Sequence, residues 1–534
     1  MSFFLKVSKL QLAQDFINAA SKGDEEETRA PDIITPCIYE PILSEVRLAS
    51  GLDGKGKIYT TPWVQNGKLY NQDYNKLKAS ALATGKLFED PEFPRDITSL
   101  YYSKPPDGME KVKWKRASKI SKTPNFFEDG VSRFDVNQGE MGNCWVVAAI
   151  ANLTMDGQLF SQVVPEDQDF ASKNYAGIFH FKFWQYGEWV DVVVDDYLPI
   201  RDGYVTPFVF LNPGSESEFW SPLLEKAYAK LYGNYEQIRS GKIAESLRDF
   251  TGGSCEHYEK KQEGFPNDLF RMMKKVSEQR CMLGCSTQLG GQGLIRNHAY
   301  SITDLLEVNL KSENVQMIRL RNPWGKTEWT GKWSDSSPEW NDVTEEQKAE
   351  AGLEMKDDGE FWMSFTDFRE YFDTIEICNI MTNFETPLEK DEKIWHMKSI
   401  HGSWVAGKTA GGCGNPGNPF QTNPKYVFEV EHPDEDDNEA QCTVLVSLIQ
   451  KDVRRKKHTG FDGWNIGFKI FSGDQFDWRK MVGGSPTYAN TCEVTGRLMV
   501  PPGKYCIIPS TFFPDEEGDF FLRIFTCNPI KAYF

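Results

Sequence analysis

The sequence lacks the features that would place the chain in a membrane, in the secretory pathway or on nucleic acid. Its longest apolar runs, such as Trp145–Ala151, are far shorter than the about 20 residues needed to cross a bilayer. The N-terminal residues, MSFFLKVSKLQ, contain neither a long apolar segment nor a cleavage site, so we expect no signal peptide. Acidic residues outnumber basic ones by 78 to 60, and this balance argues against a nucleic-acid partner.

Paired metal-binding motifs are missing as well. The 11 cysteines are scattered and odd in number, which indicates reduced thiols and a cytoplasmic location. Cys281 and Cys285 lie close in sequence, but no second cysteine or histidine pair matches them. Buried core thiols are therefore a better interpretation of this pair than a zinc site. No loop of the form D-x-D-x-D-G occurs, so the sequence contains no EF-hand calcium loop.

Length and composition indicate a globular chain of three or four domains. The chain has 534 residues, of which 40% are hydrophobic and 13% aromatic. Residues 1–70 are mixed and polar, and we interpret them as an N-terminal extension. Helix and strand signals alternate over residues 71–240, and residues 241–386 contain strand-like runs and many tryptophans. From 390 to 534, short β-rich runs separated by Gly, Pro and Asp predict an antiparallel β-sandwich.

Local patterns predict several elements. Small and apolar residues predict a helix over Cys144–Leu153, and alternating polarity predicts a strand over Glu188–Pro199. Ser221 followed by Pro222 predicts a helix start with Ser221 as its cap. A strand-like run surrounds His298. The strands predicted in the C-terminal part are YVFEVE, CTVLVSLIQ, WNIGFKIF, GKYCIIPSTF and FFLRIF.

Three segments carry residues suited to covalent catalysis. The first, Gln138–Trp145, places Cys144 at a predicted helix N-terminus, where the helix dipole favours the thiolate. Gln138 can offer its side-chain amide to a developing oxyanion, beside the N–H of the cysteine. The second segment contains His298. The third contains Asn322, which can accept a hydrogen bond from the imidazole and select its tautomer.

Each of these elements alone has an ordinary structural explanation. A cysteine before a helix is usually a core residue, a histidine in a strand is usually hydrogen-bonded in the core, and Asn-Pro-Trp is usually a turn. The order Cys, His, Asn, with the last two far downstream, agrees with a papain-like arrangement in which distant residues meet across a cleft. The combination favours a cysteine protease.

The same segments resemble the calpain family. QGEMGNCWVVAAIANLT resembles its cysteine segment, NHAYSI its histidine segment, RNPWGKTEWTGKWSD its asparagine segment, and GDFFLRIF its β-sandwich. The resemblance implies an α+β fold, in which a two-lobed papain-like protease core is followed by the antiparallel β-sandwich. Residues 71–240 would be the cysteine lobe and residues 241–386 the histidine and asparagine lobe. It also implies an intracellular, calcium-activated endopeptidase that cleaves proteins through a thioester intermediate.

The resemblance also assigns roles to individual residues of the catalytic site. It implies Cys144 as the nucleophile, His298 as the base and Asn322 as the orienting residue. Gln138 would be the oxyanion donor, and Trp324 would be a wedge in the cleft between the lobes.

Calcium ligands are implied in both lobes. In the first lobe they are the carbonyls of Glu128 and Gly130 and the carboxylates of Asp135 and Glu218. In the second they are Glu328, Asp335, Asp358, Glu360 and the carbonyl of Lys356. Such oxygens suit calcium, although spacing alone would favour solvated loop carboxylates. Without the ion, we expect the carboxylates to repel each other and misalign the lobes, so that Cys144 lies too far from His298 to react.

Several departures from the family pattern are visible. Asn143 stands where the family usually has aspartate, and Val146–Val147 replace a leucine pair. Asn297 replaces a glycine before the histidine, which leaves the local backbone geometry open. We find no EF-hand domain of the conventional type, so we expect a monomer without an EF-hand small subunit.

The predicted β-sandwich contains a sharp charge contrast. Residues 432–439 form an acidic loop, and a basic run follows the next predicted strand, with Lys451, Arg454, Arg455, Lys456 and Lys457. Such runs are usually solvated loops. The functional alternatives are a surface that responds to calcium or to a phospholipid membrane, or an electrostatic contact with the protease core.

Two other functions compete with the protease. A catalytically silent calcium-binding scaffold is disfavoured because Cys144, His298, Asn322 and Gln138 are all intact. A calcium-dependent transglutaminase shares the cysteine and the histidine but needs an acidic third residue, which Asn322 is not.

Overall fold

The computed structural model describes residues 46–49, 63–139, 142–170, 173–201, 212–213, 215, 217–261, 266, 268–277, 281–310, 313–380, 393–434 and 440–533. Most of the predicted N-terminal extension and residues 435–439 of the acidic loop lie outside these ranges. The described residues all belong to the compact unit Pro41–Phe534. Within them, no helix is both long and apolar enough to cross a membrane.

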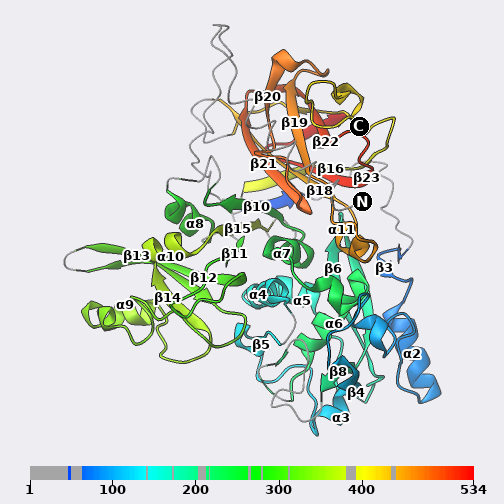
Figure 1. Ribbon diagram of the computed structural model, residues 1–534, viewed down its shortest axis with the longest axis vertical. Coiled ribbons are helices and arrows are strands. Elements are labelled where there is room, and N and C mark those ends of the chain that lie inside the picture. The colour runs from blue at the N-terminus through cyan, green and yellow to red at the C-terminus, as the bar shows by residue number, and fades with distance from the viewer. Residues whose placement is uncertain are drawn as a thin grey trace. The chain divides into compact units, whose positions relative to one another are not determined.

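The first part of the predicted protease region (residues 71–386) is built around the helix α4 (Figure 1). This helix, Cys144–Leu153, is apolar on every face, and all its residues after Cys144 are buried. A helix that is apolar all round belongs in a core, and α4 packs against α7. The helices of this part are α2 (Tyr74–Thr84), α3 (Ala117–Ile120), α4, α5 (Gly157–Val163), α6 (Trp220–Tyr232) and α7 (Ile243–Thr251).

Short sheets complete this part of the chain. A four-stranded sheet has the order β2-β3-β7-β6, and two further pairs are β4 with β8 and β5 with β9. The bounds are β2 (Val64–Gln65), β3 (Lys68–Leu69), β4 (Val112–Arg116), β5 (Val136–Asn137), β6 (Ile178–Gln185), β7 (Glu188–Asp195), β8 (Tyr197–Arg201) and β9 (Asn212–Pro213).

A six-stranded antiparallel sheet forms the second part of the protease region. Its order is β10-β15-β11-β12-β13-β14, and β12 begins at His298. The strands are β10 (Ser254–Glu259), β11 (Cys281–Thr287), β12 (His298–Asn309), β13 (Asn314–Arg321), β14 (Glu360–Ser364) and β15 (Thr374–Asn379), with helices α8 (Leu269–Ser277), α9 (Glu345–Glu350) and α10 (Phe365–Tyr371). Ser301 Oγ on β12 donates to the carbonyl of Ala148 on α4 at 2.9 Å, which joins this sheet to the central helix.

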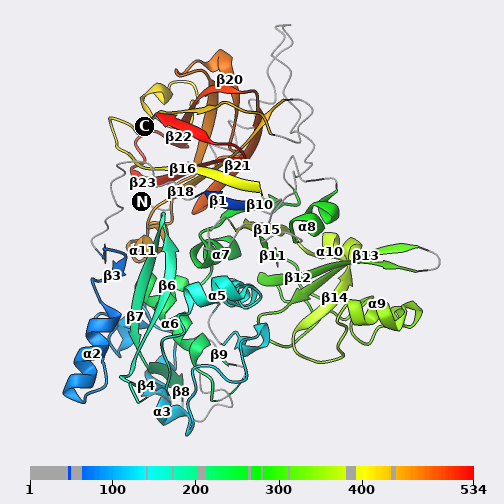
Figure 2. The same ribbon diagram turned by 180° about the vertical axis from the view of Figure 1, so that it is seen from behind.

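Two five-stranded sheets form the C-terminal sandwich, seen from behind in Figure 2. Their orders are β1-β16-β23-β18-β21 and β20-β19-β22-β17-β24. The bounds are β1 (Val46–Ala49), β16 (Lys393–Trp404), β17 (Tyr426–Val430), β18 (Cys442–Gln450), β19 (Ile466–Ser472), β20 (Met481–Gly484), β21 (Glu493–Val500), β22 (Gly503–Thr511), β23 (Gly518–Thr526) and β24 (Ile530–Tyr533). A short helix, α11 (Val453–Lys456), follows β18.

Both faces of β18 are buried. Val444, Val446 and Leu448 enter the core between the two sheets. Ile449 points to the opposite face and packs with Trp184 and Tyr186 of the protease region. The sandwich therefore meets the protease region through apolar side chains of its outer face.

The remaining short helices are single turns in the loops. They are η1 (Ile97–Ser99), η2 (Met109–Lys111), η3 (Arg133–Asp135), η4 (Tyr235–Ile238), η5 (Pro338–Asp342), η6 (Phe420–Thr422), η7 (Lys457–Thr459) and η8 (Trp478–Lys480). Of these, η3 contains the predicted calcium ligand Asp135.

The α+β fold class predicted from the sequence is confirmed, as are the helix over Cys144–Leu153 and the five strands predicted in the sandwich. Two local predictions are wrong. Glu188–Pro199 is two strands, because Asp196 turns inward to Arg116 and Tyr175 and separates them. The helix α6 starts at Trp220, and Ser221 lies inside it, with its Oγ donating to the carbonyl of Asp135 at 3.3 Å.

Candidate active site

The predicted nucleophile lies at the first position of α4. Asn143 precedes it, and its carbonyl accepts from the N–H groups of Val146 and Val147 at 2.9 and 3.2 Å. The Asn143 side chain does not cap the helix but donates from Nδ2 to the carboxylate of Glu225 on α6. The side-chain amide of Asn143 therefore anchors the start of α4 to α6.

The surroundings of Cys144 keep its thiol protonated in this state. Burial raises the pKa of Cys144, and the N–H groups of Ala299, Trp145 and Cys144 itself lower it by less. Ala299 directly follows His298, so the sulfur lies beside the beginning of β12. Among the residues that the structure describes, no hydrogen bond joins Cys144 Sγ to His298. The described residues thus bring the backbone of β12 beside the sulfur without a hydrogen bond between the thiol and the imidazole.

The pair of His298 and Asn322 is assembled. His298 Nε2 lies 2.9 Å from Asn322 Oδ1. Asn322 Nδ2 donates to the carbonyls of Lys326 and Thr327 at 2.9 and 2.8 Å. The oxygen of the amide must therefore face the imidazole, and Nε2 must carry the hydrogen. Nδ1 is left as the basic nitrogen, and burial lowers the pKa of His298 to about 4, so the ring is neutral near pH 7.

The backbone before His298 has the geometry that a glycine would provide. Asn297 has φ 53°, in the left-handed region, which asparagine tolerates better than most residues. The replacement of the family's glycine by Asn297 therefore preserves the turn into β12.

Trp324 joins Gln138 to His298. Its ring lies edge-on to the imidazole, with centroids 5.3 Å apart and planes at 62°. Its Nε1 donates to Gln138 Oε1 at 3.1 Å, and the Gln138 N–H donates to the carbonyl of Pro323 at 2.7 Å. Because an indole N–H can only donate, the amide oxygen of Gln138 faces Trp324 and its NH₂ group points elsewhere.

The carboxylates predicted to bind calcium in the first lobe lie close to one another. Burial, together with the charges of Asp135 and Glu128, raises the pKa of Glu218 to about 7. Burial also raises the pKa of Asp135. Glu218 Oε1 accepts from the Glu128 N–H at 2.9 Å, and the Glu128 carboxylate accepts from Ser215 and Ser217. Gly130 is exposed and has φ 102°, between Glu128 and Asp135.

The second predicted cluster contains an oxygen without a partner. Asp335 Oδ2 is buried and has no hydrogen-bond partner within the described part of the chain. Burial and the charges of Glu328 and Asp358 raise the pKa of Asp335 to about 7. Glu328 Oε1 accepts from the N–H groups of Asp358 and Gly359 at 3.0 and 2.8 Å. The Lys356 side chain is paired with Glu354, and only its carbonyl was predicted as a ligand.

These donors suit a hard cation, but they are not assembled around one. In the described ranges, no group of three or more His, Cys, Asp or Glu residues has metal-binding geometry. Glu360 is held instead by Arg133, with Nε and Nη2 donating to its two oxygens at 2.8 and 2.7 Å. The buried carboxylates with raised pKa and the unsatisfied Asp335 oxygen fit a calcium ion in chemistry.

Two arginines in these clusters were missed by the sequence analysis. Arg133 lies two residues before Asp135 and pairs with Glu360 of the other lobe. Arg321 precedes Asn322, is buried, and donates to the carbonyl of Asp358 at 2.6 Å. Both arginines could have been predicted from the sequence, because each lies close to predicted site residues and clustered carboxylates need positive charges nearby.

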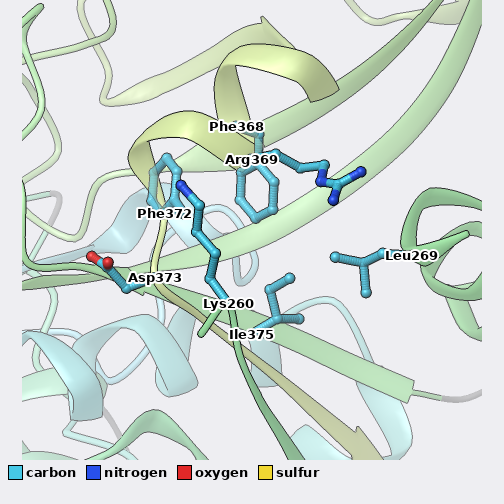
Figure 3. A pocket seen from close by; sticks show the side chains of 7 residues that line it. All are labelled: Lys260, Leu269, Phe368, Arg369, Phe372, Asp373 and Ile375. Atoms are coloured by element: carbon cyan, nitrogen blue, oxygen red, sulfur yellow. The ribbon is translucent and has the colours of Figure 1, made fainter. Parts of the chain in front are cut away.

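A cavity elsewhere in the second part of the protease region contains none of the predicted site residues (Figure 3). Its walls come from α8, α10, β15 and the end of β10. The residues that line it are Lys260, Leu269, Phe368, Arg369, Phe372, Asp373 and Ile375.

Comparison with known proteins agrees with this geometry. Residues 88–379 match the family described as "Calpain family cysteine protease", and residues 400–525 match "Calpain large subunit, domain III". Calpain-A of Drosophila melanogaster is 43% identical over 97% of this chain and 65% of its own length. Calpain-B of the same organism is 46% identical over 85% of this chain and 51% of its own length.

A mammalian relative gives a similar result. The calpain-2 catalytic subunit of Mus musculus is 43% identical over 86% of this chain and 68% of its own length. The chain thus spans about half to two thirds of the curated relatives that it matches. The protease match covers more than half of the chain and includes Cys144, His298 and Asn322. The chain belongs to the calpain family of cysteine proteases, with a catalytic domain followed by domain III.

Proposed function

We propose that this chain is a calcium-activated cysteine endopeptidase that cleaves proteins at a few sites. The observation that supports the proposal is the neutral His298 held by Asn322, together with the contact of the Cys144 sulfur with the backbone of Ala299, the residue after His298. A base of this kind next to a thiol at a helix N-terminus is the arrangement that nucleophilic catalysis by cysteine requires.

In the proposed mechanism, His298 Nδ1 takes the proton of the Cys144 thiol. The sulfur then attacks the carbonyl carbon of the scissile peptide, and the carbonyl π electrons move to oxygen. The imidazolium returns the proton to the leaving nitrogen as the C–N bond breaks, which leaves a thioester on Cys144. His298 next deprotonates a water molecule that attacks the thioester, and the thiol and the carboxylic acid product are released.

Gln138 would stabilise the oxyanion that forms in each step. Its amide oxygen is engaged by Trp324, which orients the amide so that its NH₂ group is presented on the other side. Together with the N–H of Cys144, this NH₂ would provide a donor pair for the negative oxygen. Trp324 would thereby position both Gln138 and the His298 ring.

The residues that would hold calcium are those predicted from the family. They are Glu128, Gly130, Asp135 and Glu218 in the first lobe and Glu328, Asp335, Lys356, Asp358 and Glu360 in the second. Bound calcium would supply positive charge among carboxylates whose pKa is raised by burial and by one another. Relief of this repulsion would let the two lobes close and bring Cys144 Sγ within reach of His298 Nδ1.

The substrates and the location are part of the same proposal. Protein substrates follow from the endopeptidase activity. All ten described cysteines are free thiols, which suits a cytoplasmic enzyme. A phospholipid membrane stays a proposed partner of the sandwich, but Arg454 of its basic run is buried in protein contacts and cannot serve as a lipid-binding residue.

The test uses the full chain and a thiol-directed epoxide. With calcium, we expect the epoxide to label Cys144, identified by mass spectrometry, and casein to be cleaved at a few sites. In chelator, both rates should fall by at least about tenfold, since misplacement of the sulfur slows every step that uses it. Cys144→Ser should abolish cleavage and leave calcium binding intact.

Two outcomes would contradict the proposal. Equal hydrolysis in chelator and in calcium would remove the calcium dependence. Unchanged cleavage by Cys144→Ser would remove the nucleophile and, with it, the assignment of the catalytic site.

A further inference from the structure

Two arginines of the basic run after β18 contact the protease region at different places. Arg454 and Arg455 are neighbours on α11, yet their guanidinium groups contact different residues. Arg454 reaches the segment behind Cys144, whereas Arg455 reaches Trp63, Tyr70 and the carbonyl of Leu231. The two side chains can therefore be compared directly.

Arg454 is held by charge and by backbone carbonyls. Its Nε and Nη2 donate to Glu245 Oε2 at 2.9 and 2.6 Å. Its Nη1 donates to the carbonyls of Gln237 and Ser240 at 2.8 and 3.1 Å. Only 4% of the residue is exposed. A guanidinium is buried at high cost unless it is paired in this way, so its position is tightly determined.

The same guanidinium covers the residue next to the proposed nucleophile. Its Cζ lies 4.2 Å from the ring centroid of Trp145, which is completely buried and whose Nε1 donates to the carbonyl of Ile238 at 3.0 Å. A Cβ on Gly241 would lie 2.5 Å from Arg454 Nη2 and 2.6 Å from the Trp145 ring. Only glycine at 241 leaves room for this close approach.

The segment that Arg454 holds is also bonded to both sides of Cys144. The Ser240 N–H donates to the carbonyl of Gly142 at 2.8 Å. Ser246 Oγ donates to the carbonyl of Trp145 at 2.9 Å. Arg454 anchors this segment at Ser240 and at Glu245. The positions of Gly142 and Trp145, on either side of Cys144, therefore depend on the 240–246 segment. Arg454 of the sandwich contacts this segment at both of its ends.

We propose that Arg454, contributed by the β-sandwich, is a positioning residue for Cys144. This inference rests on the proposed role of Cys144 as nucleophile. Through Trp145 and the 240–246 segment, Arg454 determines where the first turn of α4 places the sulfur. A displacement of about 1 Å at a reacting atom can cost about 100-fold in rate, so an anchor at this distance matters to the chemistry.

The experiment compares Arg454→Gln with the matched control Arg455→Gln, with Cys144→Ser as the inactive reference. Arg455→Gln removes a neighbouring guanidinium that joins the same two regions but contacts nothing in the Cys144 segment. For each variant we would measure kcat and KM on a fluorogenic peptide, the rate of Cys144 alkylation by iodoacetamide in calcium, and the unfolding midpoint in urea.

We expect Arg454→Gln to lower kcat and the alkylation rate by at least about tenfold while KM changes by less than about twofold. Arg455→Gln should leave kcat and the alkylation rate within about twofold of the parent. Arg454→Lys should fall between, because an ammonium retains the charge opposite Glu245 but cannot cover the Trp145 ring with a flat face. A purely structural role would lower the unfolding midpoint of both glutamine variants without this kinetic difference.

Parent-like kcat and alkylation in Arg454→Gln, or an equal loss in Arg455→Gln, would overturn the inference. If Arg454→Gln does not fold, Glu245→Gln decides instead: it should lower kcat in the same direction, and a parent-like value would overturn the inference. The proposed function fails on separate results: cleavage of the peptide by Cys144→Ser, or equal hydrolysis in chelator and in calcium.

Discussion

At the residue scale, Asn322 shows how one side chain can determine the chemistry of another. Its Nδ2 is committed to the carbonyls of Lys326 and Thr327, so its Oδ1 can only accept, and it accepts from both His298 and the Trp324 N–H. The amide therefore fixes the tautomer of His298 and the direction of its ring. The sequence could suggest this role from residue type, but the tautomer follows only from the two carbonyls.

Asn322→Ala is the first prediction. It removes the acceptor from His298 Nε2, so the ring can rotate and adopt the other tautomer. We expect kcat to fall by about 100-fold with KM changed by less than about threefold. Steady-state kinetics on a fluorogenic peptide at saturating calcium measures this. A kcat within about twofold of the parent would mean that another group orients the imidazole.

At the element scale, the turn after β13 is packed against the turn before β14. Gly359 has φ 86°, and a Cβ there would lie 2.8 Å from the Lys326 N and 2.9 Å from the Asn322 O. The Asn322 N–H donates to the Gly359 carbonyl at 2.7 Å. This contact places the asparagine that orients the imidazole beside the predicted ligands Asp358 and Glu360.

Gly359→Ala is the second prediction. Backbone atoms surround the added methyl group and cannot move aside as a flexible side chain could. We expect a loss of at least about 2 kcal/mol in the free energy of unfolding, measured by urea titration. Gly85→Ala is the control, because Gly85 has φ 65° but nothing within 4 Å of an added Cβ. It should cost only about 1 kcal/mol, and equal losses would show that the close packing is unimportant.

The sequence predicts well those elements whose residue pattern is determined mainly by burial of apolar side chains. The helix over Cys144–Leu153 is apolar on all faces and was predicted with its bounds. The break at Asp196 and the start of α6 at Trp220 were missed, because distant partners such as Arg116 decide them. For the basic run, the sequence left open both a solvated loop and an electrostatic contact with the protease core. Arg454 makes such a contact, with Glu245, which lies far away in sequence.

At the scale of the whole molecule, calcium binding and proton binding should compete at the clusters of both lobes. The pKa values of Glu218 and Asp335 are raised to about 7 by burial and by neighbouring carboxylates. Because their unfolded values are about 4, these groups hold extra protons in the folded, calcium-free chain. They therefore lower its stability as the pH rises between about 4 and 7, and calcium should reverse this loss.

The third prediction is that the apparent calcium affinity increases as the pH rises from about 6 to about 8 and then levels off, with protons released on binding. Calorimetric titration in buffers of different ionisation enthalpy measures both quantities. Asp335→Asn should remove part of the pH dependence. An affinity that is equal at the two pH values, without proton release, would show that these carboxylates do not bind the ion.

The fourth prediction concerns the pair that joins the two lobes. Arg133 on η3 makes two parallel bonds to Glu360 on β14, and in its absence Glu360 would keep the Thr303 hydroxyl and Arg319, whose Nε is 3.7 Å away. Burial acts to raise the pKa of Glu360, but Arg133 and Arg319 outweigh it and leave the pKa below its usual value. The Glu360 carboxylate therefore stays charged, and its two bonds to Arg133 fix its orientation.

We expect Arg133→Ala to lower kcat/KM by about tenfold at saturating calcium, because the lobes lose a bidentate contact close to the site. Arg133→Lys should be intermediate, since an ammonium cannot form two parallel bonds with one carboxylate. Arg95→Ala is the control: it removes a solvent-exposed pair with Glu89 within the first lobe and should change kcat/KM by less than about twofold. If Arg133→Ala matched this control, the ion pair would be incidental, and lobe alignment would depend on other contacts, such as those of Gln138 with Trp324 and of Ser301 with Ala148.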